Sequence, residues 1–113
     1  MTGVQTCALP IYEGALRYID RAAACDPKAE RRAFVEWVGK ADDIVSELRI
    51  ALDKEPSPQI AEGLERVYEF AQFQLSQALI RGDIQPLAHA RKALATLLEG
   101  WRQIELQTTG GHG

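Results

Sequence analysis

Three breaks in the chain constrain its fold more than any other feature, because each combines residues that end or begin helices. They are Asp26-Pro27, the run Glu55-Pro56-Ser57-Pro58, and Arg81-Gly82-Asp83. Proline lacks the backbone N–H that a helix interior needs, and glycine tolerates the left-handed conformation that closes a helix. The breaks therefore divide the chain into four segments, each of which can be tested for a helical period.

All four segments place apolar residues at the spacing of three and four that marks one face of a helix. The segments run from about Tyr12 to Ala24, from Asp26 to about Lys54, from Ser57 to about Arg81, and from Asp83 onward. Asp26, Ser57 and Asp83 are the predicted N-caps, with Pro27 and Pro58 at first helical positions. The predicted apolar faces are Tyr12, Ala15, Leu16, Ile19 and Ala23; Phe34, Trp37, Val38, Ala41, Ile44, Val45, Leu48 and Leu52; Ile60, Leu64, Val67, Ala71, Leu75 and Ala78; and Leu87, Ala90, Leu94, Leu97, Leu98, Trp101 and Ile104.

The short connections between the segments predict that consecutive helices are antiparallel neighbours. A chain of 113 residues supports a single hydrophobic core. We therefore expect an all-α fold, an antiparallel up-down four-helix bundle formed by residues 12–106, followed by a flexible polar tail at residues 107–113. The first helix is expected to be shortened, because its segment has about half the length of the other three.

The stretch ahead of Tyr12 does not continue the helical pattern. Met1 to Ile11 lacks a helical period and places Pro10 next to the start of the first predicted helix. All of its residues match, in order, the translation of a common short-read sequencing adapter. We therefore predict that residues 1–11 are a non-native, adapter-derived segment, which stands where the front half of the first helix is expected.

Charge and composition exclude several classes of function. The formal net charge is −3, with 13 basic residues dispersed among 16 acidic ones, so the chain offers no basic field for nucleic acid. Cys7 and Cys25 have neither the number nor the spacing of a disulfide framework or a zinc site. No apolar run approaches the roughly 20 residues of a membrane span. We expect a reduced, cytoplasmic protein with no nucleic-acid partner and no membrane insertion.

Residues suited to catalysis are few. The two histidines are His89 and His112, and the Glu-x-x-His pattern of di-iron bundles fails because Pro86 stands three residues before His89. Acidic groups such as Asp42-Asp43 and Glu62 lie on polar faces, where solvated carboxylates are the simpler interpretation. Phosphate-binding loops and nucleophile motifs are absent from the sequence. We predict no enzyme activity, no catalytic residue, no metal site and no cofactor.

Several large apolar residues fall outside the predicted core faces. They are Phe70, Phe73 and Ile80 in the third segment, with Val35 and Ile50 in the second. Two interpretations remain open at this point. These are isolated surface residues of the kind that every protein carries, or they form grooves that receive amphipathic segments of a partner.

A set of short motifs, in order along the chain, resembles the flagellar secretion chaperone FliS family. The motifs are Tyr12-Glu13-Gly14-Ala15-Leu16, Ile44-Val45-Ser46-Glu47-Leu48-Arg49 with Leu52-Asp53, Ile60-Ala61 with Leu64, Tyr68-Glu69-Phe70, and Trp101. The resemblance covers Tyr12 to Ile104. It implies a cytoplasmic four-helix chaperone that binds the C-terminal segment of flagellin, prevents premature polymerisation and keeps flagellin competent for export. Components of the export gate are a further partner class that the resemblance implies.

The resemblance also suggests a partner-binding surface, with Ile44, Leu48, Ile50 and Ala51 from the second helix and Val67, Phe70, Ala71 and Gln74 from the third. Leu48, Val67 and Ala71 can equally be core residues. The chain departs from the family pattern at Phe73, where a basic residue is common, and at Arg91, where an apolar residue is usual. The alternative function is a structural bundle that mediates only self-association, as a homo-oligomer through the apolar face that a shortened first helix leaves uncovered.

Overall fold

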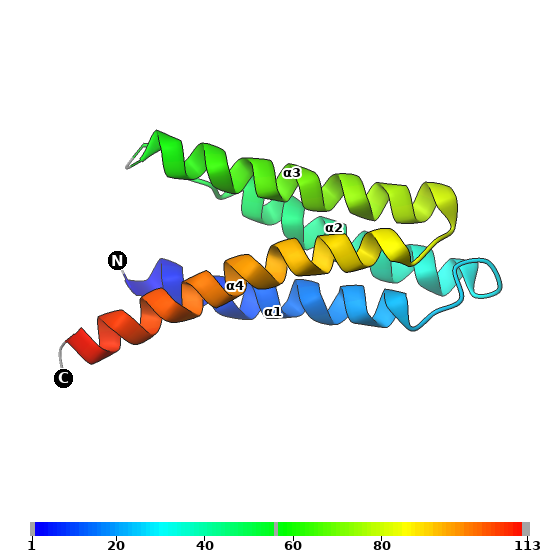
Figure 1. The fold of residues 1–113 in the computed structure, drawn as a ribbon, viewed down its shortest axis with the longest axis horizontal. Helices are drawn as coiled ribbons and strands as arrows, with labels where there is room; N and C mark the ends of the chain where they lie inside the picture. Colours follow the sequence, from blue (N-terminus) through cyan, green and yellow to red (C-terminus); the bar gives the residue numbers. More distant parts are fainter. Residues whose placement is uncertain (1, 56, 112–113) are drawn as a thin grey trace.

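The computed structural model describes residues 2–55 and 57–111, so that Met1, Pro56, His112 and Gly113 lie outside the description. The described residues form four helices and no strand: α1 (Thr2–Ala23), α2 (Arg31–Ile50), α3 (Pro58–Arg81) and α4 (Gln85–Gly111). Consecutive helices run antiparallel, and each helix packs against two others, α1 and α3 both contacting α2 and α4 (Figure 1). The predicted all-α, antiparallel four-helix bundle is confirmed.

Helix α1 is not shortened, which corrects the sequence prediction. It begins at Thr2 and continues through Pro10 to Ala23. A proline inside a helix removes one backbone hydrogen bond and crowds the carbonyl four residues earlier, a cost that packing can offset. Leu9 packs against the core next to the buried Tyr12, which provides such packing on both sides of Pro10. The origin of residues 1–11 stays a prediction, but in the structure residues 2–11 supply the first half of α1.

Helix caps explain where the other helices begin. Ser57 caps α3 as predicted, its side chain accepting the N–H of Ile60, with Pro58 in the first helical turn. Asp83 accepts the N–H of Gln85 at 3.0 Å, as expected for the start of α4. Asp26, in contrast, caps a separate turn: its Oδ1 accepts the N–H groups of Lys28 and Ala29 at 2.9 and 3.0 Å. These two hydrogen bonds lower the pKa of Asp26.

The ends of α2 and α4 also differ from the prediction. Because the turn after Asp26 occupies residues 27–30, α2 begins only at Arg31, and it ends at Ile50 rather than near Lys54. Helix α4 remains helical to Gly111, where the sequence favours a polar tail from residue 107. Its last turns extend beyond the ends of the other helices (Figure 1).

The core lies along the axis of the bundle and receives residues from all four helices. Three predicted core positions are wrong: Ala22 is buried in place of Ala23, Ile60 is 66% exposed while its neighbour Ala61 is buried, and Ile104 is 41% exposed. Tyr68 is buried although it was not assigned to the core, and its hydroxyl is hydrogen-bonded to that of Tyr12. The buried cluster comprises Tyr12, Ala15, Leu16, Ile19, Ala22, Phe34, Val38, Ala41, Val45, Tyr68, Ala71, Leu75, Ala78, Leu87, Ala90, Leu94 and Leu98.

Candidate functional site

The residues of the predicted partner-binding surface differ widely in exposure. Ala71 is fully buried in the core, so its side chain is not available to a ligand in this structure. Ile44 and Leu48 are half-buried against the core, whereas Ile50 is 84% exposed and Phe70 is 46% exposed. Of the remaining members, Ala51 is exposed, and Val67 and Gln74 are half-buried.

The structure also separates these residues into two sets. Ile44 faces α1, because a Cβ atom placed on Gly14 would lie 3.5 Å from its Cδ1. Leu48 and Ala51 follow Ile44 at helical spacing and share that side of α2. On α3, residues 67, 70 and 74 lie on the side away from Gln72, which contacts α2. Since α2 and α4 are the packing neighbours of α3, this second set faces α4.

A polar network lies between the two sets, at the α2–α3 interface. The side-chain amide of Gln72 donates to Asp42 Oδ1 at 3.0 Å and to Ser46 Oγ at 2.9 Å, and its Oε1 accepts from Arg49 at 2.9 Å. Arg49 also donates to Glu69 at 3.1 Å. The interface is therefore already occupied by mutually bonded polar groups, so an apolar ligand segment inserted there would have to displace them.

The network continues toward the end of α2. Glu65 contacts Lys54 at 3.1 Å and Arg49 at 3.7 Å, and its pKa is lowered mainly by the hydrogen bond with Lys54. Ile50 lines a shallow hollow at this end together with Ser46, Arg49, Glu65 and Gln72. The sequence analysis missed the network, although polar residues at positions 42, 46 and 49 recur at helical spacing and mark a polar strip beside the apolar face.

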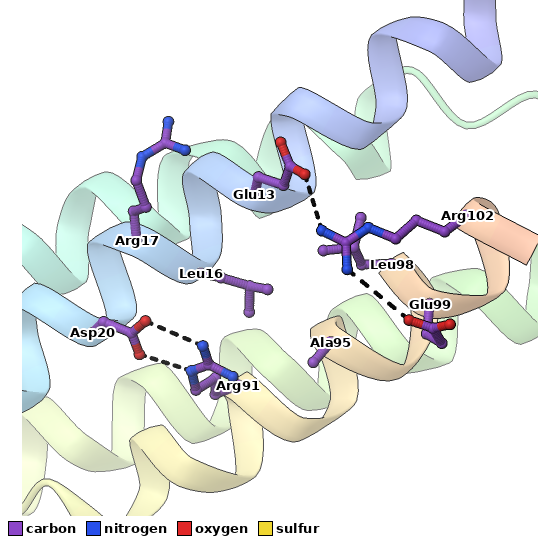
Figure 2. Close-up of a pocket in the computed structure, with 9 residues that line it drawn as sticks. All are labelled: Glu13, Leu16, Arg17, Asp20, Arg91, Ala95, Leu98, Glu99 and Arg102. Carbon is purple, nitrogen blue, oxygen red and sulfur yellow. Dashed lines mark hydrogen bonds and ion pairs between the residues drawn. The ribbon is translucent and has the colours of Figure 1, made fainter. Parts of the chain in front are cut away.

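The α1–α4 interface is closed by ion pairs (Figure 2). Arg91 binds Asp20 through two bonds of 2.7 and 3.1 Å, and Arg102 binds Glu13 at 3.0 Å. Between the two pairs lies a shallow hollow with Leu16, Ala95 and Leu98 among its lining residues. The hydrogen bond with Asp20 raises the pKa of Arg91. Arg91 stands where an apolar residue is usual in the resembled family. In this structure its ion pair with Asp20 links α4 to α1.

The α3–α4 interface has a different chemistry, because none of the described ion pairs joins these two helices. Helices α3 and α4 are antiparallel and joined by a short turn at Gly82, so residues equally far from that turn lie level with each other. Helical spacing places a row of uncharged residues along this side of both helices. We call this row the α3–α4 face: Ile60, Gly63, Val67, Phe70 and Gln74 from α3, with Ala93, Leu97, Gly100 and Ile104 from α4.

Large apolar groups of the α3–α4 face are open to solvent. Ile60 is 66% exposed, Phe70 is 46% exposed and Ile104 is 41% exposed. The two glycines leave room at the backbone, since a Cβ atom at Gly63 or Gly100 would meet nothing within 4 Å. An exposed apolar row that carries no charge and has space over its backbone is suited to receive an apolar helix or extended segment.

A comparison with known protein families shows to which family this chain belongs. The sequence model of the family described as "Flagellar protein FliS" matches residues 5–108. The chain belongs to the FliS family. The matched range begins inside the stretch Met1 to Ile11 and includes nearly all of the bundle.

Curated FliS proteins show the same relationship. The chain is 30% identical over 95 residues to the flagellar secretion chaperone FliS of Salmonella typhimurium, an alignment that covers 83% of this chain and 70% of the relative. It is 35% identical over 69 residues to FliS of Vibrio cholerae, covering 61% of this chain and 51% of that protein. With FliSB of Pseudomonas aeruginosa it shares 32% identity over 89 residues, covering 76% and 71%.

The motifs that resemble FliS mainly hold the bundle together. Tyr12 and Tyr68 form the buried hydroxyl pair, Gly14 is buried next to Ile44, and Ser46 and Arg49 belong to the polar network. The motifs therefore identify this FliS bundle mainly through its packing, and only Ile60 and Phe70 among these motif residues also lie on the α3–α4 face. Among the described residues no helix is long and apolar enough to cross a membrane, and within the same ranges no His, Cys, Asp and Glu side chains cluster as metal ligands do.

Proposed function

We propose that this member of the FliS family is a cytoplasmic chaperone that binds the C-terminal segment of flagellin, prevents its premature polymerisation and keeps it competent for export. The observation that carries the proposal is the α3–α4 face, a row of uncharged residues in which Ile60, Phe70 and Ile104 are exposed and Val67 and Leu97 are half-buried. The curated relatives are flagellar secretion chaperones, which supports an export substrate as the partner.

The proposed mechanism is masking. A segment that polymerises through apolar surfaces is kept unassembled when the chaperone covers those surfaces with its own apolar face. A ligand that is disordered when free loses conformational entropy on binding, so a long apolar contact is needed to offset that loss. Helices of more than 20 residues provide such length. The cycle needs binding and release only, with no cofactor and no chemical turnover.

Within this proposal, Val67, Phe70 and Gln74 of the originally predicted surface act together with Ile60, Leu97 and Ile104. Ile44, Leu48 and Ala51 lie on the other side of the bundle, beyond the core and the polar network. A single straight segment therefore cannot contact both sets. Ile50, at the outer edge of the α2–α3 interface, is also separate from the α3–α4 face.

Isothermal titration with a synthetic peptide of the cognate flagellin C-terminal segment tests the proposal. We expect saturable binding at micromolar or lower concentration, with the negative heat-capacity change that accompanies apolar burial. Phe70→Glu should weaken binding by about tenfold or more, because it places a charge in the apolar contact. Val35→Glu is the matched control, since Val35 is 41% exposed on α2 and Phe70 is 46% exposed on α3. Circular dichroism verifies that both variants are folded.

Two outcomes would contradict the proposal. Absence of binding by the folded chain at micromolar peptide would refute the chaperone function itself. Equal effects of the Phe70 and Val35 substitutions would instead refute the assignment of the α3–α4 face.

Self-association is the second candidate function, favoured by the overhanging end of α4, where Leu106 is 66% exposed (Figure 1). Sedimentation measurements over a range of concentrations separate the two candidates. A stable oligomer that is insensitive to the flagellin peptide supports self-association, whereas a monomer that binds the peptide supports the chaperone.

A further inference from the structure

The α1–α2 side of the bundle carries an aromatic pair surrounded by positive charges. The rings of Tyr18 and Trp37 are stacked, with centroids 5.7 Å apart and an interplanar angle of 26°. The guanidinium carbon of Arg21 lies 5.1 Å from the Trp37 ring centroid. Lys40 Nζ lies 5.8 Å from the Tyr18 ring and 5.9 Å from the Trp37 ring. The two cations are thereby held over aromatic faces at the surface.

The positive charges of this group are not neutralised by a neighbour. Arg17 precedes Arg21 by one helical turn on α1 and also borders the α1–α4 hollow, where Glu13 and Asp20 are paired with Arg102 and Arg91 (Figure 2). Its guanidinium lies over Gly14, 3.7 Å from the position of a Cβ atom there. Within residues 2–55 and 57–111, no carboxylate forms an ion pair with Arg17, Arg21 or Lys40. A cation–π contact positions a cation without cancelling its charge, so all three remain able to bind an anion.

This arrangement contrasts with the α2–α3 and α1–α4 interfaces. The formal net charge is −3, and the arginines of the α2–α3 and α1–α4 interfaces are paired with carboxylates. On the α1–α2 side, apolar surface adjoins the free cations: Trp37 is half-buried, and Ile44 follows it by two helical turns on the same side of α2, next to Gly14. We call these residues, Arg17, Tyr18, Arg21, Trp37, Lys40 and Ile44, the aromatic-basic face.

We propose that the aromatic-basic face is a second docking surface, which binds an acidic amphipathic helix of a protein partner. The apolar side of that helix contacts Trp37 and Ile44, which are about 10 Å apart along α2, a distance that two turns of a partner helix match. Its Asp and Glu side chains bind Arg17, Arg21 and Lys40. Charge complementarity thus selects an acidic partner and rejects a basic one.

The proposal goes beyond flagellin binding and does not depend on it. Helices α1 and α2 form the side of the bundle opposite to the α3–α4 interface, since α1 contacts α4 and α2 contacts α3. A ligand on the α3–α4 face therefore leaves the aromatic-basic face open. The chain can hold an export substrate on one side and an acidic partner on the other at the same time.

The test uses the full chain and a synthetic amphipathic peptide of about 18 residues, five helical turns, with Leu on one side and Glu on both flanks. Trp37 is the reporter, and Trp37→Phe identifies which part of the tryptophan fluorescence belongs to it. We expect a saturable change in Trp37 fluorescence that weakens as salt rises from about 50 to about 500 mM. A peptide with Lys in place of each Glu should not bind.

A matched pair of variants tests the location. The triple variant Arg17→Glu, Arg21→Glu and Lys40→Glu should bind the acidic peptide about tenfold or more weakly. The control triple changes Arg32, Arg66 and Lys92 to Glu; these are exposed cations of α2, α3 and α4 outside the aromatic-basic face, and the net charge of the two triples is the same. The control should bind within about threefold of the unmodified chain, because distant charges are screened in salt.

Several results would overturn the proposal. Equal losses in the two triples would mean that overall charge alone drives binding. Equal binding of the Lys peptide, or no saturable change with the Glu peptide, would refute the proposal that the partner is an acidic helix. If anionic phospholipid vesicles bound in place of the peptide, the face would be assigned to a membrane surface. Phe70→Glu should leave acidic-peptide binding intact, so failure of this proposal is distinguishable from failure of flagellin binding.

Discussion

The buried hydroxyls of Tyr12 and Tyr68 connect α1 to α3 through the centre of the bundle, between two helices that are not packing neighbours. Both side chains are nearly inaccessible, at 1% and 3% exposure. Each hydroxyl is the hydrogen-bond partner of the other. Replacing either tyrosine with phenylalanine keeps the ring and removes only the hydroxyl.

This mutual pairing sets the expected free energies. Removal of one hydroxyl from a buried pair costs about 1–3 kcal/mol when its partner is left unsatisfied. Tyr12→Phe leaves Tyr68 without its partner, and Tyr68→Phe leaves Tyr12 without its partner, so we expect about 2 kcal/mol for each. The double variant leaves no unpaired tyrosine hydroxyl at this site. It should therefore be less destabilised than the sum of the two, with a coupling energy of about 1 kcal/mol.

Urea unfolding followed by circular dichroism measures all four free energies of unfolding, with thermal unfolding as a second reading. A loss of 1 kcal/mol should lower the Tm by about 4 °C for a domain of this size. Additive single effects, giving a coupling energy near zero, would show that the two hydroxyls do not act as a bonded pair.

Three further predictions follow from the structure. Burial raises the pKa of Tyr12 and Tyr68, so the free energy of unfolding should be largest below pH 10 and should decline as the pH rises further. The decline should be up to about 1.4 kcal/mol per pH unit for each tyrosine, and it should be smaller in the double phenylalanine variant. Gly82→Ala should lower the free energy of unfolding by about 1 kcal/mol in urea titrations, because Gly82 has a φ of 62°. For the exposed Asp20–Arg91 pair, Asp20→Arg should cost up to about 1 kcal/mol, and adding Arg91→Asp should restore it in a double-mutant cycle.

The helical segments and most of their caps were predictable because they depend on local properties. Ser57 and Asp83 act on N–H groups two or three residues away, and Gly82 closes α3 through its own backbone conformation. Residues spaced by three and four identify the apolar side of a helix without reference to its neighbours. Asp26 shows the limit of this reasoning, since the same capping chemistry closes a turn before α2.

The candidate site was harder to predict because it depends on how each helix is rotated against its neighbours. Phe70 was expected outside the core face of α3 and is 46% exposed, but the predicted surface combined it with Ile44 and Leu48 as if all three residues faced one groove. Gln72 decides otherwise, since its amide binds Asp42 and Ser46 and fills the α2–α3 interface with polar groups. Successive side chains of a helix point about 100° apart, so adjacent residues of α3 can face different neighbouring helices.

By itself, the sequence determined the number of helices, their order, their apolar sides and the relationship to FliS, because these follow from local spacing and from short motifs. The tertiary structure alone decided that α1 continues through Pro10, that Tyr12 meets Tyr68, and that four interfaces carry four different chemistries. The physical reason is that hydrogen bonds and ion pairs across helices need two side chains at one level and one orientation. The spacing of apolar residues along one helix predicts neither the level nor the orientation of a side chain relative to a neighbouring helix.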